Sequence, residues 1–166
     1  IAYASRQALA TLGVWRHLAD DKGNIQAQPM LDIRVTDGAV STGASALFLH
    51  YDHREMDNQP FGYMVENRHL RQALHARAGE IPTLELIAPM TAAGFERDAS
   101  GVSAVLENGR TLRCRLLIGA EGRTSPTRQA AGIAVSGWRY GQAGIVCTVR
   151  HERPHNGVAQ ERFLPA

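Results

Sequence analysis

The chain has 166 residues, which suits one domain or a large part of one. Hydrophobic residues make up 44% of it, so a packed core can form and global disorder is excluded. Its 18 basic and 16 acidic side chains give a net charge of +2, which argues against a nucleic-acid partner because such binding requires a concentrated basic surface. No apolar run approaches the roughly 18 residues of a membrane span, and no signal peptide is visible.

The ends of the chain indicate whether it is a fragment, and its cysteines indicate the redox compartment. The chain lacks an initial Met, enters a helical pattern almost at once and stops within an expected strand, so we expect a middle fragment of a longer protein. Cys114 and Cys147 lie far apart and form neither a metal-ligand spacing nor a disulfide framework. We therefore expect reduced, partly buried thiols in a cytoplasmic protein.

Helical periodicity occurs twice in the first half of the chain. Apolar residues recur at helical spacing over residues 5–20, with Ser5 as the expected N-cap. A second helix is predicted to begin near Asn67 and to end at Gly79.

Strand patterns account for most of the remainder. The predicted strands cover residues 30–36 and 46–51, several segments within residues 83–119, and residues 142–152 and 158–164. Asn108-Gly109 is the strongest hairpin signal among them. Continuous apolarity at residues 116–118 predicts a strand covered on both faces, as in a parallel sheet. We therefore expect an antiparallel meander that leads into a strand of an α/β sheet.

The segment GAEGRTSP, residues 119–126, is a glycine-rich turn into a short helix, with Ser125 as the expected N-cap. Glycines let the backbone approach a ligand closely, and a helix start offers unpaired N–H groups to a phosphate. Glu121 could accept hydrogen bonds from ribose hydroxyls. The alternative is a tight turn in which Glu121 points to solvent, and the local chemistry leaves both readings open.

The wider segment LIGAEGRTSPTR, residues 117–128, resembles the second flavin fingerprint of the FAD-dependent aromatic-ring monooxygenases, the class of para-hydroxybenzoate hydroxylase. The positions that match this fingerprint are Gly119, Ala120, Gly122, Ser125 and Arg128. Glu121 stands where the family has Asp and is one methylene longer. The resemblance implies that Glu121, Gly122, Ser125 and Arg128 lie on the cofactor side.

Other segments resemble the ubiquinone-biosynthesis hydroxylase branch of that class. They are residues 4–15, 65–74, 152–155 and 159–165, which occur in the order and at about the spacing of the branch. Asn67 stands where many relatives place Arg or Gln near the flavin diphosphate, so the resemblance adds Asn67 to the cofactor-binding residues. The family's first Gly-x-Gly-x-x-Gly motif and its later Gly-Asp motif do not occur in the sequence. We therefore expect the isolated chain to be inactive.

The resemblance implies an α/β (mixed α+β) fold. Residues 1–29 and 61–135 would form part of an FAD-binding Rossmann-like domain with a β-meander, and residues 30–60 and 136–166 part of an antiparallel-sheet substrate domain. The implied function is hydroxylation of the phenolic ring of a polyprenylated ubiquinone precursor with FAD, NAD(P)H and dioxygen. The alternatives are a flavin-dependent reductase or halogenase on the same scaffold, or a non-catalytic interaction module.

The implied location is the cytoplasm, peripheral to the inner membrane, because ubiquinone intermediates dissolve in membranes. The sequence does not decide whether the protein forms an oligomer or joins a biosynthetic complex. It assigns no catalytic acid or base. His50 and His53 around Asp52 raise the question of a metal ion. On a strand, residues three apart point to opposite faces, so shared ligation would need a loop, and we expect no metal site.

Overall fold

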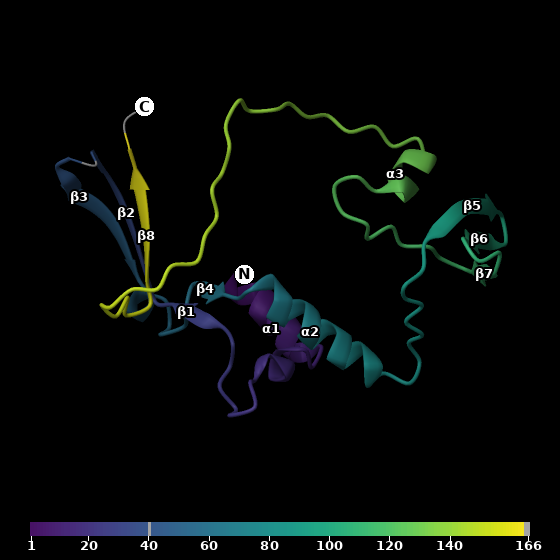
Figure 1. Ribbon diagram of the computed structural model, residues 1–166, viewed down its shortest axis with the longest axis horizontal. Coiled ribbons are helices and arrows are strands. Elements are labelled where there is room, and N and C mark those ends of the chain that lie inside the picture. The colour runs from purple at the N-terminus through teal and green to yellow at the C-terminus, as the bar shows by residue number, and fades with distance from the viewer. Residues whose placement is uncertain (40, 165–166) are drawn as a thin grey trace. The chain divides into compact units, whose positions relative to one another are not determined.

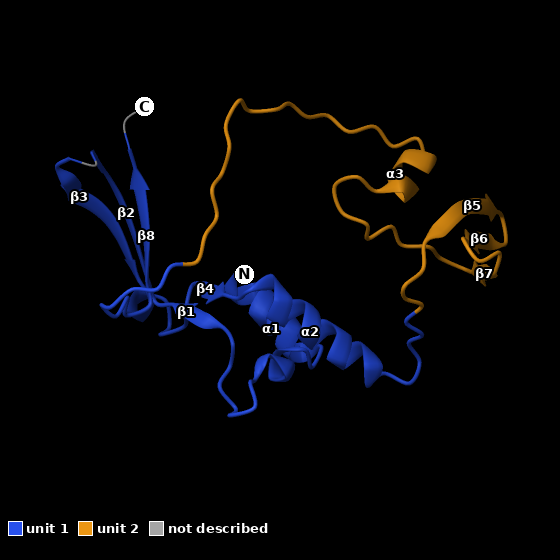
Figure 2. Cartoon of the chain, viewed as in Figure 1, with its two compact units in different colours: residues 1–86, 149–166 blue, residues 87–148 orange. Residues whose placement is uncertain are grey.

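The computed structural model describes residues 1–39 and 41–164. The chain forms two compact units, which are Ile1–Leu86 with Val149–Ala166, and Ile87–Thr148 (Figure 2). The chain contains both short helices and small sheets, which confirms the predicted mixed α/β class. No helix in the described ranges is long and apolar enough to cross a bilayer.

The helices of the first unit build its core (Figure 1). They are α1 (Tyr3–Thr11), the short 3₁₀ helix η1 (Trp15–Leu18) and α2 (Asn67–Gly79). Val14, Leu18 and Ala73 are buried together, and Leu9, Trp15 and Val65 pack around them. The predicted start of the second helix near Asn67 is confirmed. Contact between α2 and η1 thus buries Leu18 and Ala73 in a small apolar core.

The bounds predicted for the first helix are wrong. The helix begins at Tyr3, so Ser5 lies inside it and does not cap it. Gly13 ends it with a φ of +77°, a left-handed conformation that glycine adopts without steric cost. The N–H of Val14 then donates to the carbonyl of Leu9 at 2.8 Å. The helical pattern over residues 5–20 is therefore two elements, because the backbone turns at Gly13.

Two sheets complete the first unit. β1 (Gln28–Met30) pairs antiparallel with β4 (Gly62–Met64). β2 (Asp32–Ala39) lies between β3 (Gly43–Asp52), which is antiparallel to it, and β8 (Val158–Phe163), which is parallel (Figure 1). The expected antiparallel sheet is therefore mixed. A parallel neighbour requires a long connection, and β8 follows β3 only after more than half of the chain.

The strands predicted at residues 46–51 and 158–164 are confirmed as β3 and β8. The strand predicted at residues 30–36 is divided at Leu31, whose N–H donates to the carbonyl of Gly157 at 2.8 Å. β1 and β4 were not predicted, because a strand of three residues is too short to show alternation.

The second unit contains an antiparallel meander, as predicted. β5 (Ala92–Asp98), β6 (Gly101–Leu106) and β7 (Thr111–Cys114) pair in chain order (Figure 1). The hairpin predicted at Asn108-Gly109 is confirmed, with Gly109 at a φ of +82°. The β5–β6 turn is held by Asp98, whose carboxylate accepts from the N–H of Ser100 at 2.7 Å.

Two predicted strands do not form in the described part of the chain. Residues 116–118 and 142–152 adopt no strand, and the side chains of Ile118 and Val146 are 76% and 97% exposed. Cys147, expected to be partly buried, is also exposed. A strand needs a neighbour for its N–H and C=O groups, and no described segment pairs with these two. Apolar patterning indicates which residues favour burial but does not supply the partner.

Candidate functional site

The glycine-rich turn leads into the short helix α3 (Pro126–Ala130), as the sequence predicts. Ser125 is buried at its N-cap, and its Oγ accepts from the N–H of Arg128 at 3.1 Å. Gly132 follows the helix with a φ of +71°. The predicted N-cap at Ser125 is therefore confirmed.

The carboxylate of Glu121 is bound to the start of α3. Its Oε2 accepts from the Oγ of Ser125 at 2.5 Å and from the N–H of Thr127 at 3.1 Å. The hydrogen bond from Ser125, followed by that from Thr127, lowers the pKa of Glu121 below its usual value. Glu121 thus stabilises the turn as an ionised acceptor, a structural role that the sequence did not indicate. A direct contact between Glu121 and a cofactor stays a prediction.

Arg128 has unused hydrogen-bonding capacity in this turn. Its Nε is shielded from solvent and has no hydrogen-bond partner among the described residues. The backbone at Gly122, with a φ of +77°, has open space where a Cβ would stand. Two N–H groups at the start of α3 are already bound by Glu121 and Ser125. An unpaired guanidinium N–H favours an anionic acceptor, so the side chain of Arg128 fits a phosphate better than these two amides do.

Asn67 belongs to the other compact unit, where it is the first residue of α2. The residue before it, Glu66, makes no side-chain hydrogen bond to cap the helix. The turn residues Glu121, Gly122, Ser125 and Arg128 are brought together in the second unit. Their joint use with Asn67 for one cofactor stays a prediction.

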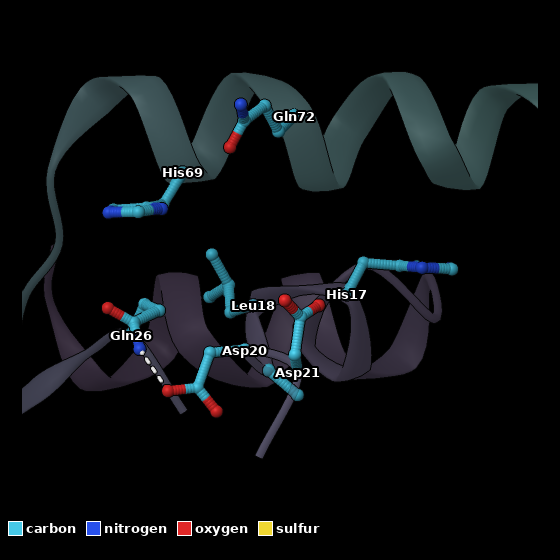
Figure 3. A pocket seen from close by; sticks show the side chains of 8 residues that line it. His17, Leu18, Asp20, Asp21, Gln26, His69 and Gln72 are labelled. Atoms are coloured by element: carbon cyan, nitrogen blue, oxygen red, sulfur yellow. Dashed lines mark hydrogen bonds between the residues drawn. The ribbon is translucent and has the colours of Figure 1, made fainter. Parts of the chain in front are cut away.

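A cavity of about 380 Å³ lies beside η1 and α2 (Figure 3). Its lining residues are His17, Leu18, Ala19, Asp20, Asp21, Gln26, His69 and Gln72. The carboxylate of Asp20 accepts from the N–H groups of Lys22 and Asn24 at 2.9 and 2.8 Å and from the side chain of Gln26 at 3.1 Å. These bonds anchor the loop after η1, so the carboxylate of Asp20 is used for structure.

The structure also brings together histidines that the spacing argument separated. β3 ends at Asp52, and His53 begins the 3₁₀ helix η2 (His53–Glu55). His50 and His53 therefore both contact Asp32, at 3.4 and 3.7 Å between nitrogen and oxygen. The loop that shared ligation would need is present. The β2–β3 register and the end of β3 at Asp52, which periodicity cannot locate to one residue, decide this arrangement.

The sequence of the chain matches a family model described as an FAD binding domain over residues 8–163. The chain belongs to this FAD-binding family. This membership confirms the predicted cofactor, FAD, and agrees with the unpaired guanidinium N–H and open glycine backbone of the turn.

Three curated relatives are named as ubiquinone-pathway enzymes. The chain is 49% identical over its whole length to the ubiquinone hydroxylase UbiL of Rhodospirillum rubrum, and covers 36% of it. It is 31% identical, again over its whole length, to the mitochondrial ubiquinone biosynthesis monooxygenase COQ6 of Rattus norvegicus, and covers 35% of it. It is 33% identical over 69% of its length to the 3-demethoxyubiquinol 3-hydroxylase of Escherichia coli, and covers 29% of it.

The chain thus spans about a third of the length of these relatives. Among solved structures, the tetracycline destructase Tet(51) matches 78% of this chain and 29% of its own, with 16% identity and a TM-score of 0.44. That likeness is too low to support an argument.

Proposed function

We propose that a protein containing this chain is an FAD-dependent monooxygenase that hydroxylates the phenolic ring of a polyprenylated ubiquinone precursor, using NAD(P)H and dioxygen. The main support is the 49% identity to the ubiquinone hydroxylase UbiL across the whole chain. In such an enzyme the flavin supplies the electron transfer and the reaction with dioxygen, while the protein binds, orients and shields.

In this proposal the glycine-rich turn binds the diphosphate of FAD. Arg128 offers its guanidinium group to the diphosphate, and Gly122 lets the backbone come close to the cofactor. Glu121 and Ser125 hold the turn in shape through their mutual hydrogen bond. Asn67 contributes a neutral amide from the start of α2.

The proposal also assigns domains. Residues 1–29 and 61–135 form part of a Rossmann-like FAD-binding domain, and residues 30–60 and 136–166 part of the substrate domain. The sheet of β2, β3 and β8 supports this division, because its strands lie wholly within the second set of ranges. Leu47 and Phe48 of β3 are 83% and 54% exposed and offer apolar surface to a polyprenyl chain. Because the polyprenyl chain of the substrate partitions into lipid, the proposed location of the protein is the cytoplasm with peripheral membrane contact.

The proposal is tested on the whole protein that contains this chain. We expect it to purify with flavin absorbance and to oxidise NAD(P)H faster when a polyprenyl phenol is added. Arg128→Met should lower FAD affinity by roughly 10- to 100-fold, because it removes a charge-assisted hydrogen bond. The matched control is Arg123→Met, an exposed arginine of the same turn, which should retain FAD.

Two outcomes contradict the proposal. A protein that neither purifies with flavin nor takes it up would favour the interaction module. If the protein binds flavin but no phenol raises its rate of NAD(P)H oxidation, a reductase or halogenase would be favoured. Equal loss of FAD in the Arg123 and Arg128 variants would contradict only the assignment of Arg128.

A further inference from the structure

Four titratable side chains meet at one end of the β2–β3 pair: Asp32, His50, Asp52 and His53. Asp32 lies directly opposite Asp52 in the antiparallel register, and His50, two residues before Asp52, shares its face of the sheet. Like charges directly opposite each other destabilise a strand pair. This end of the sheet therefore favours positive charge, and Arg54 already supplies part of it through its ion pair with Asp52.

The spacing of the nitrogen and oxygen atoms is the first observation. Nδ1 of His53 lies 3.4 Å from Oδ1 of Asp52 and 3.7 Å from Oδ1 of Asp32. These distances exceed the roughly 2.9 Å of an ordinary N–H···O hydrogen bond. They are close to the separation of about 3.3 Å between ligand atoms around a tetrahedral zinc ion with bonds of about 2.0 Å. One ligand atom from each of the three residues lies within 4.8 Å of the others.

The shielding of the cluster is the second observation. The side chains of Asp52, Asp32 and His53 are only 12%, 20% and 22% exposed. Nδ1 of His53 is itself shielded from solvent and has no hydrogen-bond partner in the part of the chain that the structure describes. A buried polar atom without a partner costs free energy, and a bound cation would remove that cost.

The carboxylates are also held in place from outside the cluster. Nε of Arg54 donates to both oxygens of Asp52, at 3.0 and 2.9 Å, and keeps the pKa of Asp52 well below its usual value. Nε2 of His50 lies 3.4 Å from the second oxygen of Asp32. Such outer contacts orient carboxylate ligands in metal sites.

We propose that Asp32, Asp52 and His53 bind a divalent transition-metal ion of the zinc class, with His50 orienting Asp32. Carboxylate and imidazole ligands suit borderline ions such as Zn²⁺ and Co²⁺, and three protein ligands leave a fourth position for water. The ion joins the start of η2 to β2, within one compact unit. The site does not depend on flavin or on the proposed function.

The test titrates the protein with Zn²⁺ by calorimetry and with Co²⁺ by visible absorption, which reports a tetrahedral environment. His53→Gln and Asp32→Asn should each weaken binding by more than roughly 100-fold, and His50→Gln by roughly 10-fold. His75→Gln, an exposed histidine of α2, is the matched control and should bind as the unaltered protein does.

A second measurement does not rely on variants that could disturb folding. In the unaltered protein, Zn²⁺ should shift the imidazole nitrogen resonances of His53 and leave those of His75 unchanged. Equal affinity in the His53→Gln and unaltered proteins, or an unmoved His53 resonance at saturating zinc, overturns the proposal. Failure to bind either ion also overturns it and leaves the contacts as imidazole–carboxylate ion pairs.

Discussion

At the scale of single residues, Glu121 illustrates how one side chain can serve the local fold and a site together. Its carboxylate accepts hydrogen bonds from Ser125 and Thr127, and these bonds lower its pKa. A lowered folded-state pKa means that the stabilisation is fully present above the unfolded-state pKa. It is lost as the pH falls through the lower, folded-state pKa.

The expected result is a pH-dependent turn. In the unaltered chain, the amide resonance of Thr127 should move as the pH falls below about 4.3, the ordinary pKa of a glutamate. Glu121→Gln should flatten this titration in NMR spectra, because the amide side chain has no charge to lose. Glu107→Gln, an exposed glutamate of the β6–β7 turn, is the control. A titration of Thr127 that persists in Glu121→Gln would contradict the hydrogen bond as its source.

At the scale of elements, the β6–β7 hairpin depends on one backbone conformation. Gly109 has a φ of +82° and open space around its missing Cβ, so an added methyl group meets strain and not a clash. Gly109→Ala should destabilise the meander by about 1–2 kcal/mol. Gly94→Ala in β5 also meets open space, without a positive φ, and should be neutral or slightly stabilising. Thermal unfolding and amide exchange of β6 would measure the stability of the two variants. Equal destabilisation by Gly109→Ala and Gly94→Ala would contradict backbone strain at Gly109 as the cause.

At the scale of the whole molecule, the chain is organised as two compact units. Leu18 is 1% exposed and is the largest fully buried side chain of the described residues. Leu18→Ala should therefore destabilise the first unit by about 2–5 kcal/mol, through lost burial and a new cavity.

Hydrogen exchange measures whether this effect is confined to one unit. Amides of α2 should exchange faster in Leu18→Ala, while those of β6, which belongs to the second unit, should be unchanged. Leu12→Ala is the control, because Leu12 is 60% exposed. Equal acceleration in both units would mean that they unfold together.

The sequence by itself determined the elements whose signals are local. The hairpin at Asn108-Gly109, the cap at Ser125 and the start of α2 at Asn67 are all where short-range chemistry predicts them. The same is true of the FAD-binding family, because its fingerprint residues all lie within the short segment of residues 117–128.

Only the tertiary structure decided the features that depend on a distant partner. Residues 116–118 and 142–152 have strand-like patterns but no described neighbour, so they form no strand. The carboxylate of Glu121 accepts from the N–H of Thr127 because the turn places it beside the start of α3. Asp32 meets His53 because β2 pairs with β3 in one register and β3 ends at Asp52. Pairing, register and closure join residues far apart in sequence, and no local propensity specifies them.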